Sequence, residues 1–86
     1  MELSKAEQVI LVRFKERAQR AGSIQPGLGM RAKAIRYISP QHPGVDFDQA
    51  LKGMVEKGWL KPNAAGTWYF LTAEGVEQVK TVPNGR

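Results

Sequence analysis

The 86-residue chain suits a single small domain, near the shortest length that buries a self-sufficient core. A hydrophobic fraction of 42% is typical of globular proteins, and the lack of cysteine excludes disulfides, thiolate metal sites and a cysteine nucleophile. The net charge of +5 modestly favours polyanionic partners such as nucleic acid. No run approaches the roughly 20 apolar residues of a membrane span, and the opening MELSKAEQ lacks the order of a secretion signal. We therefore expect a soluble, unprocessed, cytoplasmic protein that does not contact a membrane.

The first predicted element is an amphipathic helix that begins after Ser4 and stops at Gly22. Ser4 and Glu7 have capping-box spacing, and apolar residues then recur every three or four positions. Val9 and Val12 lie away from this apolar stripe. We expect another helix of the domain, most simply the C-terminal one, to cover them, and a dimer contact is the alternative. Three arginines beside the stripe are interpreted as solvated side chains rather than phosphate contacts: Arg13, Arg17 and Arg20.

A glycine- and proline-rich loop over residues 23–29 precedes a short second helix, predicted over Met30–Ile38. We expect Ile24 to lie at a sheet edge. Pro40 stops the helix. His42 has no carboxylate or histidine at helical spacing, which argues against a metal or catalytic role and predicts a surface loop position. The helix exposes three basic residues: Arg31, Lys33 and Arg36.

The stretch from Asp46 to Gly75 organises the rest of the chain. Asp46 and Gln49 give a capped helix start, and Gly58 is a left-handed stop, which predicts a helix over Asp46–Lys57. Gly53, inside this helix, costs about 1 kcal/mol relative to alanine. We favour close packing against another element as its reason, over close approach of a ligand backbone. The expected outer face comprises Asp48, Gln49, Lys52, Gly53, Glu56 and Lys57.

A β-hairpin follows, with strands predicted over Trp59–Lys61 and Thr67–Leu71. Alternation places Tyr69 and Leu71 on one face, with Leu60. The other face carries Trp68 and Phe70, and we expect Trp59 to pair with them across the hairpin. For this outer aromatic face we rank coverage by the chain's own termini first, a protein partner second and base stacking last.

Thr72 is predicted to cap a last helix whose Val76 and Val79 point inward, and Pro83–Arg86 is expected to be a frayed tail. The combination of ALKGMVEKGWLK with YFLTAEGVEQV resembles winged helix-turn-helix domains, especially the small MarR- and PadR-like bacterial regulators. The resemblance covers nearly the whole chain. It implies an α+β fold, a winged helix with a three-helix core, a β-hairpin wing and a short C-terminal helix, in a single domain over residues 1–82.

The resemblance also implies a non-catalytic DNA-binding module in transcription or in plasmid or phage control, with no cofactor and no metal. The recognition helix is then Asp46–Lys57, supported by Met30–Ile38, and a regulator reading a palindrome would be a homodimer. Carried over by position, the contacts to double-stranded DNA are Arg31, Lys33, Arg36, Gln49, Lys52, Lys61, Asn63 and Thr67. The alternative is a protein-interaction module that uses Trp59, Trp68 and Phe70, or Val9 and Val12. An enzyme is the weakest hypothesis, because no nucleophile, base and orienting group come together in the pattern.

Overall fold

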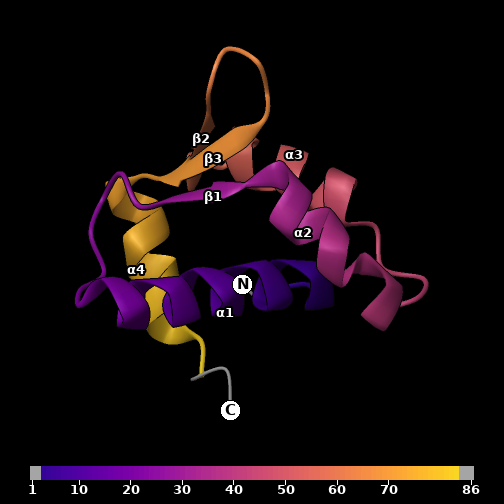
Figure 1. Cartoon of the computed structure of the whole chain (residues 1–86), viewed down its shortest axis with the longest axis horizontal. Coiled ribbons are helices and arrows are strands. Elements are labelled where there is room, and N and C mark those ends of the chain that lie inside the picture. Colours follow the sequence, from indigo (N-terminus) through magenta and orange to yellow (C-terminus); the bar gives the residue numbers. More distant parts are fainter. Residues whose placement is uncertain (1–2, 84–86) are drawn as a thin grey trace.

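The computed structural model describes residues 3–83, which form an α+β domain of helices around a three-stranded antiparallel sheet (Figure 1). The expected frayed tail lies outside the described residues except for Pro83. No helix within residues 3–83 is both long and apolar enough to cross a bilayer. In chain order the elements are α1 (Lys5–Ala21), β1 (Gly29–Arg31), α2 (Ala32–Ile38), a 3-10 helix η1 (Ser39–Gln41), α3 (Phe47–Glu56), β2 (Leu60–Pro62), β3 (Trp68–Leu71) and α4 (Ala73–Thr81).

The predicted caps of α1 and α3 are confirmed. Ser4 and Glu7 form a complete capping box at α1, and Gly22 ends that helix with φ 93°. The Asp46 side chain accepts a hydrogen bond from the Gln49 backbone N–H at the start of α3. Gly58 follows α3 with φ 81°. Short polar side chains and left-handed glycines thus position the helices on the core.

The sheet contains a strand that the sequence patterns did not predict. β1 pairs with β3, which lies in the centre of the order β1-β3-β2. The prediction of a helix from Met30 was therefore wrong at its start, since α2 begins at Ala32. The predicted hairpin of β2 and β3 is confirmed, and β1 adds a third strand to it. Three residues are too few for an alternating pattern to stand out. Ile24 is half-buried against the core. The loop itself is joined to β3 by the Gly27 N–H, which donates to the Leu71 carbonyl, and by the Leu28 carbonyl, which accepts from the Leu71 N–H.

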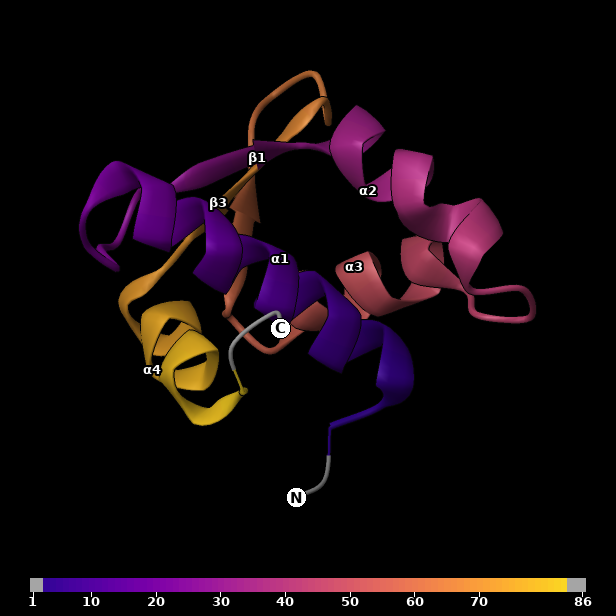
Figure 2. The ribbon, with the colours of Figure 1, turned by 60° about the horizontal axis from the view of Figure 1, so that its bottom comes forward.

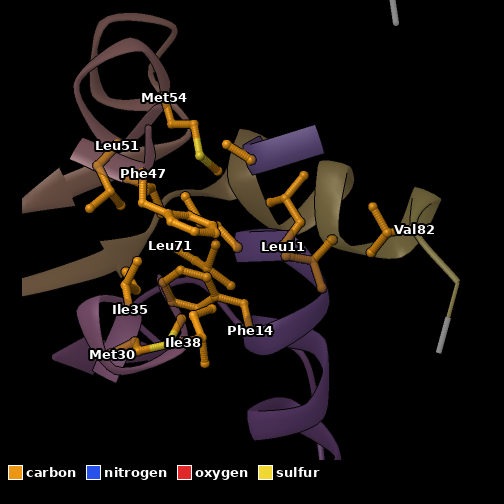
Figure 3. Close-up of a cluster of buried hydrophobic side chains, with 14 of the residues drawn as sticks. Leu11, Phe14, Met30, Ile35, Ile38, Phe47, Leu51, Met54, Leu71 and Val82 are labelled. Atoms are coloured by element: carbon orange, nitrogen blue, oxygen red, sulfur yellow. The ribbon is translucent and has the colours of Figure 1, made fainter. Parts of the chain in front are cut away.

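The core lies between the sheet and the helices. Figure 3 shows Phe14 of α1 and Phe47 of α3 near Ile35 and Met30, which come from α2 and β1. The fully buried large side chains are Phe14, Ile10, Leu11, Ile35, Met54 and Val79. Leu60 and Leu71 face each other across β2 and β3 and are both buried, which confirms the predicted inner face of the hairpin.

Trp59 packs against this core, so its predicted pairing with Trp68 and Phe70 is wrong. It lies just before β2, and the Lys57 Nζ sits 4.6 Å from its ring centroid. The turn at Gly58 directs the indole toward α3 rather than across the hairpin. The outer aromatic face of the sheet is therefore smaller than expected.

The two helical glycines have opposite surroundings. An added Cβ at Gly75 would lie 2.0 Å from the Trp59 carbonyl oxygen, so α4 approaches the chain closely there. The Thr72 hydroxyl accepts a hydrogen bond from the Gly75 N–H at the same junction. At Gly53, by contrast, an added Cβ would meet nothing within 4 Å. The expectation that Gly53 serves close packing is therefore wrong.

The helix that lies beside Val9 and Val12 of α1 is also not the predicted one. Figure 2 shows α3 and α4 beside different parts of α1. Val9 and Val12 are half-buried and border a shallow depression with Ile38 and His42, so the α2–η1 end lies beside them rather than the C-terminal helix. His42 is half-buried, and its ring meets Phe47 edge-on at 5.9 Å, so it is less exposed than predicted.

Candidate nucleic-acid interface

The outer face of the sheet combines aromatic and basic side chains. Opposite residues of an antiparallel pair share a face, and Arg31 lies opposite Trp68 while Lys61 lies opposite Phe70. The Arg31 guanidinium carbon is 5.1 Å from the Trp68 ring centroid. The Trp68 and Phe70 rings stack with 6.2 Å between centroids. Cations therefore flank the aromatic pair on both neighbouring strands.

Gly29 explains how the second aromatic fits on this face. An added Cβ there would lie 2.6 Å from Phe70 Cε1, so the Phe70 ring covers the glycine. Both aromatic residues are half-buried by these contacts. The described C-terminal segment lies elsewhere: Lys15 on α1 donates a hydrogen bond to the Val82 carbonyl, and the end of α4 lies across α1 from the hairpin (Figure 1). The expectation that the termini cover the aromatic face is thus not met by the described residues.

A basic groove lies between the start of α2 and the tip of the β2–β3 hairpin. Its lining comes from two segments that are far apart in the sequence but neighbours in the fold. We use the name basic groove for the surface lined by Arg31, Ala32, Lys33, Arg36, Ala65, Gly66, Thr67 and Trp68. Four of the predicted DNA contacts, Arg31, Lys33, Arg36 and Thr67, meet here. The structure brings them together although the sequence assigned them to two separate elements.

Backbone and side-chain hydrogen bonds hold the two walls of the basic groove in place. The Ala32 N–H donates to the Thr67 carbonyl at 2.9 Å, which joins the start of α2 to the hairpin. The Asn63 Oδ1 accepts from the Thr67 N–H at 2.8 Å and from the Trp68 N–H at 3.1 Å. Its Nδ2 donates to the Thr67 hydroxyl. Asn63 therefore orders the hairpin tip, a structural role beside its predicted DNA contact.

The cations of the basic groove have no acidic partners within residues 3–83. Arg31, Lys33 and Arg36 are exposed and take part in none of the ion pairs of this part of the chain. Tyr37 lies beside them on α2 and is 80% exposed. The sequence reasoning missed Tyr37, although its position four residues after Lys33 places both on one helix face.

The outer face of α3 has a different electrostatic character. Asp48 and Glu56 are exposed there beside Gln49 and Lys52. Gln49 and Lys52 do not line the basic groove. Asp46 and Asp48 border a separate depression that also contains Arg36. The two predicted contacts on α3 therefore stand among carboxylates and outside the basic groove, while Arg36 borders both depressions.

Lys57 adds little positive charge to the outer face of α3, because it forms an ion pair with Glu7 of α1. Glu7 is only 6% exposed, and burial raises its pKa, but hydrogen bonds from Lys57 and Ser4 outweigh burial and hold the pKa below its ordinary value. The carboxylate thus stays charged and keeps Lys57 at the α1–α3 junction. Lys57 is exposed as predicted, and the ion pair adds a partner on α1 that the sequence did not indicate.

Few other groups of metal-binding or acidic side chains lie together within the described residues. Within residues 3–83, no three His, Asp or Glu side chains come together as a possible metal site. Glu74, on α4, is exposed, as is Glu77, which pairs with Lys80. Comparisons with protein-family models, curated proteins and solved structures returned no match.

Proposed function

We propose that this chain is a non-catalytic DNA-binding module of the winged helix class, acting in transcription or in plasmid or phage control. The observation that supports the proposal is the cluster of exposed cations around the basic groove, none of which forms an ion pair within residues 3–83. Clustered lysine and arginine side chains neutralise backbone phosphates and release counterions, which is the main source of affinity for duplex DNA. The element order and the sheet are compatible with a winged helix, with the β2–β3 hairpin as the wing.

A titration of fluorescently labelled duplex DNA over a salt series tests this function. Binding through three or four phosphate contacts predicts that log affinity falls with log salt with a slope of about −3 to −4. Arg31→Ala is expected to weaken binding and to reduce the slope by about one. Micromolar protein without salt-sensitive binding would contradict the proposal.

Protein interaction through the outer aromatic face is the second candidate. It is supported by the half-buried Trp68 and Phe70 pair, which forms a small apolar surface. The flanking Arg31 and Lys61 favour an anionic partner over an apolar one. Size-exclusion chromatography and partner capture with Trp68→Ala test this second candidate, because the substitution would abolish a protein contact centred on the indole.

A further inference from the structure

We propose that duplex DNA lies against α2 and the β2–β3 hairpin, and that α3 stays outside the major groove. Binding then depends on backbone phosphates and is nearly independent of base sequence. This inference rests on the proposed DNA-binding function and differs from the docking that the family resemblance implies, in which α3 is the recognition helix. It assigns the contact surface to Arg31, Lys33, Arg36, Tyr37, Lys61 and Thr67.

The distribution of charge is the first argument. An α3 inserted in the major groove would bring Asp48 and Glu56 between two rows of phosphates, and like charges repel there. Lys52 is the one cation of that outer face not paired within residues 3–83, because Lys57 is held by Glu7. The capping carboxylate of Asp46 adds negative charge at the N-terminal end of the helix.

The shape of the basic groove is the second argument. Its two walls are joined by the Ala32–Thr67 hydrogen bond, and Asn63 fixes the hairpin tip. Arg31 is further held over Trp68. Cations that are already ordered lose less conformational entropy when they bind, so a preformed groove favours phosphate contacts.

The side chains of Tyr37 and of the hairpin tip are the third argument, because they support binding that is nearly independent of the DNA sequence. Tyr37 is exposed on the same face of α2 as Lys33, and its hydroxyl can donate a hydrogen bond to a phosphate oxygen. The side chains of the tip residues Ala64 and Ala65 carry no donor or acceptor that could read a base edge. The hairpin tip therefore adds no base-reading side chain from Ala64 or Ala65 to the phosphate-binding groups of the proposed surface.

Two single substitutions test the docking mode with equal loss of charge. Lys33→Ala and Lys52→Ala each remove one exposed lysine from a helix, on the proposed surface and on α3 respectively. Each would be titrated against the same 20-base-pair duplex over a salt series, after circular dichroism confirms the fold. We expect Lys33→Ala to weaken binding several-fold and reduce the salt slope by about one. Lys52→Ala should change the affinity less than about twofold, with an unchanged slope.

A second pair of substitutions, Tyr37→Phe and Gln49→Ala, tests the same docking mode without changing the net charge. We expect a measurable loss of affinity for Tyr37→Phe and none for Gln49→Ala. The wild-type protein should bind duplexes of one length but unrelated sequence with similar affinities. A larger effect of Lys52→Ala or Gln49→Ala, or strong preference for one duplex, would overturn the inference and leave DNA binding intact. If the wild-type protein shows no salt-sensitive binding, the proposed function itself fails.

Discussion

Two glycines on neighbouring helices have different physical reasons for being glycine. Both lie within a helix, where glycine costs about 1 kcal/mol of helix propensity relative to alanine. At Gly75 the cost is offset by the close approach of the Trp59 carbonyl, where an added Cβ would lie 2.0 Å away. At Gly53 nothing lies within 4 Å of that position, so packing offers no compensation.

Alanine substitutions at these glycines should therefore change stability in opposite directions. Gly75→Ala forces α4 away from the Trp59 carbonyl and is expected to destabilise the protein by about 2 kcal/mol or more. Gly53→Ala should stabilise it by about 0.5–1 kcal/mol. Urea denaturation followed by circular dichroism measures both free energies of unfolding. A destabilised Gly53→Ala variant would show that the space around α3 is not open.

Much of the residue-level structure could be predicted from short-range patterns. Caps such as Ser4 and Asp46 depend on side chains three residues apart, which a sequence displays directly. The environments of Gly53 and Trp59 could not be predicted, because they depend on which distant segment packs there. Nor could the pairing of Lys57 with Glu7, since fifty residues separate the two side chains.

At the scale of elements, that ion pair couples the start of α1 to the end of α3. The pKa of Glu7 is lowered in the folded protein, against an ordinary value of 4.5. A carboxyl with a depressed folded pKa stabilises the protein above its unfolded pKa, and this contribution is lost as the pH falls through the folded pKa. Acid should therefore loosen the contact between α1 and α3.

Glu7→Gln tests this coupling and keeps the capping geometry, since glutamine also completes a capping box. At pH 7 we expect a loss of about 1–2 kcal/mol, because a charged hydrogen bond is removed. The difference from the wild type should shrink as the pH falls below 4.5 and vanish below the folded pKa. Denaturation at a series of pH values measures it, and a difference that is constant with pH would contradict the ion-pair account.

The hairpin is a second element whose order depends on one side chain. Asn63 accepts hydrogen bonds from the Thr67 and Trp68 N–H groups and cannot be replaced by alanine without leaving both donors to water. Asn63→Ala is expected to cost about 1 kcal/mol and to speed amide exchange at Thr67 and Trp68. Hydrogen exchange followed by NMR measures this. Unchanged protection at both amides would show that the tip is ordered by other contacts.

Across the whole molecule, the net charge of +5 is divided unevenly. The cations at β1, α2 and the hairpin are unpaired within residues 3–83, whereas α3 exposes carboxylates. The sequence places each charge on an element, but the meeting of α2 with the hairpin depends on the pairing of β1 with β3. Because β1 is only three residues long, the candidate site was predicted as separate parts and not as one groove.

The two tryptophans lie in different surroundings, so their fluorescence can show where DNA binds. Trp68 lines the basic groove beneath Arg31, whereas Trp59 packs against the core beside Lys57. If DNA occupies the groove, a titration should change the fluorescence of Trp68 and leave that of Trp59 nearly constant. Trp59→Phe is therefore expected to retain the fluorescence change and Trp68→Phe to lose it, with binding followed independently by the labelled DNA. A change that persists in Trp68→Phe would place the contact nearer α3, since Trp59 follows that helix directly.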